Sequence, residues 1–292
     1  NLTKLLTVTS PNLTIAAAGA TLSGGGTLFL NTLATSAVIG ASAAATLTNN
    51  DKIQGTGQLG DGQLTIVNGA SGSINANLTT ALTINTGAGT LSNAGLIESV
   101  NIGGLTITGA ISNTGSLLVT KGTLLVNGAV TGAGVVKIGG GTADFASTFT
   151  QNVTFTGTTG VLELAKSQTY TGQVTGLAVA GTSSLDLLDI AYAGGTTTAT
   201  FSGTTTSGTL TVTDGTHTSK ITLIGNYLGH TFTTSSDGHG GTTVVDPPAP
   251  GSGGHVIPLV NAIAGFGGGA GTSLGSAPPN HVTRLGLIGA PA

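Results

Sequence analysis

Short stretches of the chain alternate an apolar residue with Thr or Ser, and a period of two is the signature of a β-strand with one buried face. The clearest stretches are Leu5–Thr9, Leu64–Ile66, Leu82–Ile84, Leu105–Ile107, Val153–Phe155, Thr209–Thr213 and Ile221–Leu223. Between residues 12 and 246, no long run places its apolar side chains at the helical spacing. Asn-Gly, Asp-Gly and Gly-Gly pairs separate the stretches and indicate tight turns. The pattern predicts an all-β protein built from short strands.

Asparagine recurs at the turns, two residues after an apolar position and close to a glycine. The recurring residues are Asn49, Asn68, Asn93, Asn113 and Asn127, at spacings of 19, 25, 20 and 14 residues. A repeat of this length with one turn residue per repeat is typical of a β-solenoid, whereas a sandwich would show longer strands. We predict a right-handed parallel β-solenoid (β-helix) in which these asparagines form a ladder. About twelve coils rising ~4.8 Å each would make a rod of about 60 Å.

The distribution of proline marks the domain limits. No proline lies between Pro11 and Pro247, as expected where backbone N–H groups are committed to sheets, and a Pro/Gly/Ser-rich linker follows. We predict β-solenoid repeats over residues 1–139 and a second β section over 140–246, whose longer apolar runs terminate or cap the stack. Residues 247–292 are expected to form a Gly/Pro-rich linker and an apolar tail.

A β-hairpin is expected within the second section, around the Asp214-Gly215 pair. A two-residue turn at this pair would place Val212 opposite His217. The apolar side chains of both strands would then share one face of the hairpin: Leu210, Val212, Ile221 and Leu223.

Composition and charge exclude several classes of function. Charged residues make up only 6% of the chain, the net charge is −3, and Arg284 is the only arginine, so the chain has no basic surface for nucleic acid. Cysteine is absent, which excludes disulfides and thiolate chemistry. Polar residues interrupt every apolar stretch before the ~20 residues of a membrane span. The Thr/Gly/Asn-rich composition is typical of an exported bacterial protein, and the lack of methionine indicates a processed product or fragment.

Few residues could carry chemistry. Asp186 and Asp189 are spaced like a carboxylate pair, but residues three apart on a strand face opposite sides, so we expect solvated carboxylates. Five residues within a short span could supply metal ligands, although their spacing does not match a known ligand pattern. These five are Asp214, His217, His230, Asp237 and His239. We therefore predict no catalytic residue, no metal site and no cofactor.

Two parts of the chain resemble known bacterial proteins. The Ser-Asn-x-Gly turns at residues 92–95 and 112–115 resemble the β-solenoid repeats of Gram-negative surface proteins, namely autotransporter passengers and filamentous-haemagglutinin-like adhesins. The segment Gly208–Pro248 is similar to a module of very large repetitive secreted bacterial proteins. The resemblance implies a non-enzymatic structural or adhesive protein, secreted or at the cell surface of a Gram-negative bacterium, that contacts surface glycans, a host or a matrix. The alternative is a glycan-active β-helix enzyme or a glycan-binding module.

An apolar segment, His255–Phe266, lies in the Gly/Pro-rich tail and is too short to span a membrane. We expect the rods to associate head to tail, with this segment adding to a neighbouring copy as a strand or plug. Alternatively, the segment docks on its own body or belongs to a following domain. The candidate assembly residues are Val256, Ile257, Leu259, Val260, Ile263 and Phe266.

Overall fold

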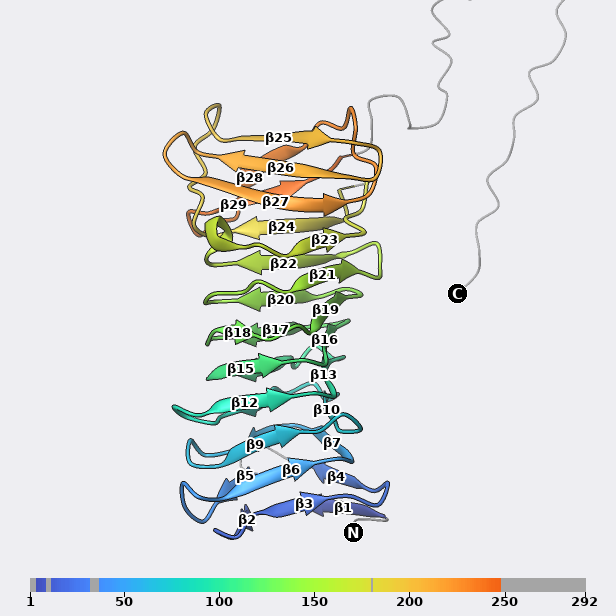
Figure 1. Ribbon diagram of the computed structural model, residues 1–292, viewed down its shortest axis with the longest axis vertical. Helices are drawn as coiled ribbons and strands as arrows, with labels where there is room; N and C mark the ends of the chain where they lie inside the picture. Colours follow the sequence, from blue (N-terminus) through green and yellow to red (C-terminus); the bar gives the residue numbers. More distant parts are fainter. Residues whose placement is uncertain (1–3, 9–11, 32–36, 180, 248–292) are drawn as a thin grey trace, which may run out of the picture. The chain divides into compact units, whose positions relative to one another are not determined.

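A computed structural model describes residues 4–8, 12–31, 37–179 and 181–247. The described residues form a parallel β-solenoid of about 8 turns, so the predicted all-β class and stacked architecture are confirmed. They contain no α-helix, and one 3₁₀ turn occurs at Ser167–Thr169. Within the described ranges, no helix is long and apolar enough to cross a membrane. Figure 1 shows the coils stacked from β1 upwards.

Three sheets run along the stack. The first sheet contains, in spatial order, β1 (Leu5–Val8), β4 (Thr27–Leu30), β7 (Lys52–Gly55), β10 (Ser73–Ala76), β13 (Leu96–Ser99), β16 (Ser116–Val119), β19 (Val135–Ile138), β21 (Asn152–Phe155), β23 (Gln173–Thr175), β27 (Thr218–Ile224), β26 (Ser207–Thr213) and β25 (Thr198–Gly203). The second contains β2 (Asn12–Ile15), β5 (Ala37–Gly40), β8 (Gly57–Leu59), β11 (Leu82–Ile84), β14 (Leu105–Ile107), β17 (Thr123–Val126), β20 (Thr142–Phe145), β22 (Gly160–Leu164), β24 (Ser183–Leu187), β29 (Thr242–Val245) and β28 (Thr233–Ser236).

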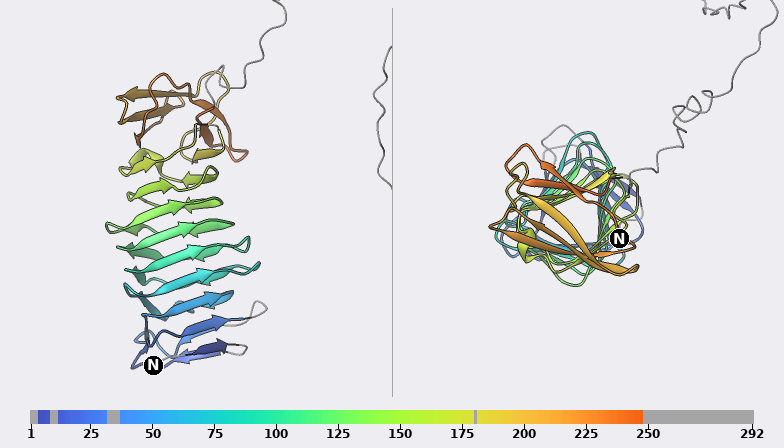
Figure 2. Two further views of the ribbon diagram at one scale, coloured as in Figure 1. Left: turned by 90° about the vertical axis from the view of Figure 1, so that its right-hand side faces the viewer. Right: turned by 90° about the horizontal axis from the view of Figure 1, so that it is seen from above.

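The third sheet is shorter than the other two. It contains β18 (Val130–Thr131), β15 (Ala110–Asn113), β12 (Thr90–Asn93), β9 (Thr65–Asn68), β6 (Thr46–Asn49) and β3 (Ala20–Leu22). The view down the stack shows the three-sided coil around its core (Figure 2).

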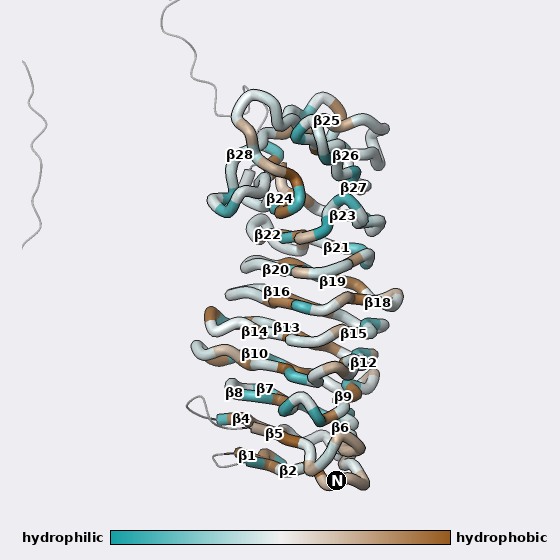
Figure 3. Tube along the Cα trace, turned by 90° about the vertical axis from the view of Figure 1, so that its left-hand side faces the viewer, coloured by the Kyte–Doolittle hydropathy of each residue, from teal (hydrophilic) through white to brown (hydrophobic). Residues whose placement is uncertain are grey.

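The core is built from apolar residues that repeat in register from coil to coil. In the first sheet, Ile53 pairs with Ile74, which pairs in turn with Ile97, and all three side chains are fully buried. In β7 and β13 the flanking residues are half-buried or exposed, as the period-two pattern predicts. In β10, Asn75 is also buried and its amide donates to Glu98 of β13. Figure 3 shows the resulting interleaving of apolar and polar residues along the coils. Stacking of like side chains on a narrow interior therefore holds the coils together.

The stack differs from the sequence-based expectation in two respects. It has about 8 turns rather than twelve, because the last part of the chain forms antiparallel strands. The parallel stack also continues past the expected boundary at residues 139 and 140, since β20, β22 and β24 extend it in register. The change in composition near this boundary instead accompanies the end of the third sheet at β18. Beyond β18, the stacked rings of Phe145, Phe149 and Tyr170 fill the interior.

Strands β25 to β29, here called the cap, cover the end of the stack. Strand β27 continues the first sheet beside β23 and forms an antiparallel meander with β26 and β25. Strand β29 pairs antiparallel with β24 and with β28. The cap thus covers the edges of two sheets with backbone hydrogen bonds.

The register of the β26–β27 hairpin corrects the sequence-based prediction. Val212 lies opposite Ser219 rather than His217, and the loop spans four residues from Asp214 to His217. The Asp214 carboxylate accepts the backbone N–H groups of Thr216 and His217 at 2.7 and 2.6 Å, which fixes this wider turn. The shift is by an even number of residues, so the predicted apolar face is preserved. Its four members are all buried: Leu210, Val212, Ile221 and Leu223.

The chain divides into two compact units, Asn1–Pro250 and Gly251–Ala292. The six candidate assembly residues of the tail lie outside the described residues.

Candidate functional site

Four of the five recurring asparagines form one buried column, at the corner where the third sheet passes into the first. Asn49, Asn68, Asn93 and Asn113 are the last residues of β6, β9, β12 and β15, and their Cα atoms are in register. Their side chains point inwards and are at most 1% exposed. The period-two alternation that buries a Leu or Ile two positions earlier in each strand also places the amide inside.

The four amides hydrogen-bond to one another in a single direction along the stack. Nδ2 of Asn49 donates to Oδ1 of Asn68 at 2.7 Å, Asn68 to Asn93 at 2.7 Å, and Asn93 to Asn113 at 2.6 Å. The amide nitrogens also contact backbone carbonyls, as Asn68 does with that of Leu96 at 3.1 Å. The column thereby satisfies polar groups that would be costly to bury unpaired.

Asn127 does not belong to this column. It is exposed and follows β17 in the second sheet, at a different corner of the coil. In its coil the ladder position is occupied by Gly132, whose φ of +93° is in the left-handed region. A Cβ there would lie 2.4 Å from the carbonyl oxygen of Asn113, so the position requires glycine.

Gln151 closes the column from the following coil. Its Oε1 accepts a hydrogen bond from Nδ2 of Asn113 at 2.8 Å, across 38 residues of chain. Its Nε2 donates to the carbonyl oxygens of Asn113, Thr131 and Gly132 at 2.8 to 3.0 Å. The extra methylene of glutamine spans the coil that lacks an asparagine. We call Asn49, Asn68, Asn93, Asn113 and Gln151 the amide ladder.

Sequence reasoning missed Gln151, although a signal was present. Gln151 follows Asn113 by 38 residues, about two coil lengths, and one coil between them has no asparagine at the matching position.

The ladder can fix the register of the stack, because a one-residue slip would move a buried amide to the outer face.

A surface groove of about 540 Å³ lies outside the same corner and crosses several coils. Small residues, two leucines and one lysine line it: Ala70, Ser71, Gly72, Ser73, Ala94, Gly95, Leu96, Gly115, Ser116, Leu118 and Lys137. This lining contains neither an aromatic ring nor a carboxylate, the groups that sugar-binding sites commonly use.

Carboxylates gather on the outer face of the second sheet. Asp144 of β20, Glu163 of β22 and Asp186 of β24 lie directly opposite one another in successive coils, and we call them the carboxylate column. Asp237 and His239, from the turn between β28 and β29, interact electrostatically with Glu163 and Asp186. Oδ1 of Asp186 and Oδ2 of Asp237 are buried and have no hydrogen-bond partner.

Burial and mutual repulsion raise the pKa of each member of the column. Burial is the larger cause at Asp186, followed by Glu163 and Asp237, and together they raise its pKa to about 6. The pKa of Asp144 is raised by burial and by Asp186, and that of Glu163 by burial and by Asp144. Glycoside hydrolysis instead requires two carboxyls whose pKa values are pushed apart. Here the pKa values of all three carboxyls are raised, so the column does not provide one protonated acid beside one ionised base.

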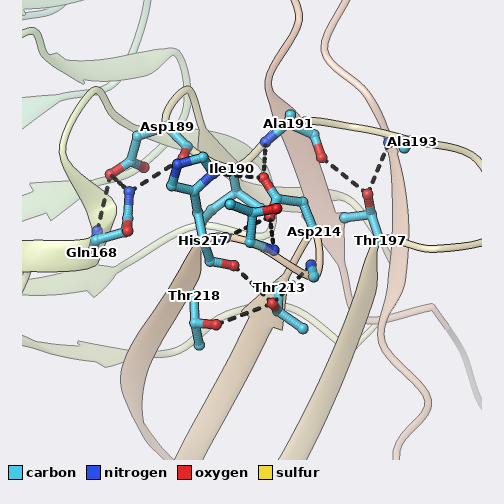
Figure 4. Close-up of polar contacts among 12 residues, drawn as sticks. Gln168, Asp189, Ile190, Ala191, Ala193, Thr197, Thr213, Asp214, His217 and Thr218 are labelled. Atoms are coloured by element: carbon cyan, nitrogen blue, oxygen red, sulfur yellow. Dashed lines mark hydrogen bonds and ion pairs between the residues drawn. The ribbon is translucent and has the colours of Figure 1, made fainter.

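The sequence-based acid pair is separated in the structure. Asp186 belongs to the carboxylate column, whereas the carboxylate of Asp189 accepts the backbone N–H groups of Ser167 and Gln168 at 3.0 and 3.1 Å. Figure 4 shows Asp189 beside Gln168. Asp189 therefore anchors the 3₁₀ turn to the following coil.

The five candidate metal ligands are distributed over three places. His217 contacts Asp214 at 3.0 Å on the surface (Figure 4), and the N–H donors of the turn hold the pKa of Asp214 well below its usual range. His230 contacts Asp246 at 2.8 Å, while Asp237 and His239 face the carboxylate column. Among the described residues, no group of three or more His, Asp or Glu side chains could hold a metal ion.

Comparison with known proteins adds no family assignment: no protein-family model matches the chain, and no curated protein matches it.

Proposed function

We propose that the chain is a non-enzymatic structural or adhesive protein, secreted or displayed at the cell surface of a Gram-negative bacterium. The observation that carries this proposal is the continuous stack of about 8 coils, whose buried polar side chains are bonded along the stack in the amide ladder. The likeness of its turns to those of autotransporter passengers and filamentous-haemagglutinin-like adhesins supports the same role. Contacts with surface glycans, a host or a matrix would be made by the outer faces.

The electrostatics favour this role over a glycan-active enzyme. The carboxylate column is the described cluster best suited to acid–base chemistry, and all three of its pKa values are raised. Glycoside hydrolysis needs one protonated and one ionised carboxyl, and three carboxyls with raised pKa values do not suit it.

We further propose that copies associate head to tail. In the described part of the chain, β1, β2 and β3 each pair with one neighbouring strand, and β1 exposes Leu5 and Leu6. Strand edges of this kind accept an added strand, and the first 50 residues carry a single charged residue, Lys4, to oppose it. The apolar tail segment is the proposed added strand, with Val260 and Ile263 among its anchors.

Light scattering on the full chain and on residues 1–250 tests this assembly, since Asn1–Pro250 forms one compact unit. The full chain should form growing particles, and residues 1–250 should remain monomeric. A full-length Val260→Asp variant should also stay monomeric, because a charge in the added strand opposes its burial. Equal growth of all three proteins would refute the role of the tail. A monomeric full chain would refute assembly itself.

A further inference from the structure

The carboxylate of Asp246, at the end of the cap, is buried and contacts a histidine. Asp246 is 0% exposed, its Oδ2 contacts Nδ1 of His230 at 2.8 Å, and its Oδ1 has no hydrogen-bond partner. The backbone carbonyl of Asp246 accepts the N–H of Gly181 at 2.9 Å, and the ring of Tyr227 packs edge-on against His230. A buried carboxylate needs a positive partner, and an imidazole supplies that charge only when protonated.

A second group of carboxylates lies under the same hairpin. Strand β29 pairs with β24, where Asp186 lies opposite Thr243. The groups that face Asp186 are Glu163 on β22, and Asp237 and His239 in the β28–β29 turn. Among these groups, His239 is the one that favours the ionised form of Asp186, while Glu163 and Asp237 oppose it. When the column is ionised, its charges therefore repel one another beneath the hairpin.

We propose that the β28–β29 hairpin is a proton-operated latch, held firmly against β24 in mildly acidic solution and opening more often as the solution becomes neutral. Opening exposes the edge of β24 and returns the carboxylates to water. This inference does not rest on the proposed function.

The direction follows from proton binding in the closed state. The pKa values of Asp144, Glu163 and Asp186 are raised in the closed hairpin, so closure binds protons that opening releases. Their favourable contribution is present at low pH and is lost as pH rises through about 6, the pKa of Asp186. Asp246 adds a second buried carboxylate at the end of the same hairpin, and its Oδ1 has no hydrogen-bond partner.

Hydrogen–deuterium exchange of the full chain at about pH 5 and about pH 7.5 tests the latch. The exchange rates are corrected for the intrinsic effect of pH, and the amides of β12 and β15, which contain no titratable side chain, serve as an internal reference. Opening of β24, β28 and β29 relative to this reference should increase about tenfold between the two conditions, because the closed state keeps the proton of Asp186 up to its pKa of about 6, one pH unit above the acidic condition. An unchanged ratio in the wild-type protein would overturn the proposal without any variant.

Substitutions separate the latch from a general effect of pH. Asp186→Asn and Glu163→Gln should each reduce the change in opening, and the double variant should reduce it most. His217→Gln is the control, because it removes an ionisable side chain of the cap that is 51% exposed and lies outside the carboxylate column. The control should retain the full change. Full retention in the double variant, or an equal loss in the control, would overturn the assignment. If the double variant does not fold, Asp186→Asn alone should still reduce the change.

Discussion

Asn93 lies near the middle of the amide ladder, and its replacement by Leu tests whether the ladder stabilises the stack. Leu has nearly the shape of Asn but neither donates nor accepts hydrogen bonds. Asn127→Leu is the matched control, since Asn127 occurs in the same sequence motif but is exposed and lies outside the ladder.

The structure sets the size of the effect. The substitution removes the donor to Oδ1 of Asn113 and the acceptor of Nδ2 of Asn68, at 2.6 and 2.7 Å. Stranding the buried oxygen of Asn113 costs about 1–3 kcal/mol. The Nδ2 of Asn68 retains contacts with the carbonyls of Leu96 and Gly72 at 3.1 and 3.3 Å. Losing its hydrogen bond to Asn93 therefore costs about 1 kcal/mol. We expect the free energy of unfolding to fall by about 2–4 kcal/mol.

Urea denaturation followed by circular dichroism near 218 nm, in the β-sheet band, measures this difference. The Asn127→Leu variant should unfold within about 0.5 kcal/mol of the parent, as surface substitutions usually do. If Asn93→Leu is no less stable than Asn127→Leu, the buried hydrogen bonds do not stabilise the stack and the reasoning is refuted.

Two further substitutions examine how the ladder ends. Gln151→Asn shortens the side chain that spans the coil lacking an asparagine. It should lower the free energy of unfolding by about 2–3 kcal/mol in the same urea experiment. An unchanged urea midpoint would contradict the bridging role of Gln151. Gly132→Ala forces an alanine into a φ of +93° and places its Cβ 2.4 Å from a backbone oxygen. This substitution should lower the free energy of unfolding by about 1–3 kcal/mol. A thermal unfolding midpoint equal to that of the parent would disprove the strain.

The strands and most of the ladder could be predicted from the sequence because both depend on local pattern. Period-two alternation decides which face of a short strand is buried, and the asparagine spacing indicated which coils would align. Asn127 could not be assigned correctly, since the same motif recurs at another corner of the coil and only the three-dimensional register distinguishes the two.

The carboxylate column was also beyond sequence reasoning. Asp144, Glu163 and Asp186 are separated by 19 and 23 residues, which matches a coil length only once the register is known. The parallel stack continues past the boundary expected at residues 139 and 140, and the reason is related. The composition changes where the third sheet ends, while the stack itself continues on two sheets.

Fibre diffraction from aligned assemblies of the full chain tests the central claim, that stacked coils form rods which join end to end. The account predicts a strong reflection near 4.8 Å along the fibre axis, since the coils rise by that spacing along the rod and the rods lie parallel to the fibre. A 4.8 Å reflection perpendicular to the fibre axis, or no oriented reflection at this spacing, would contradict it.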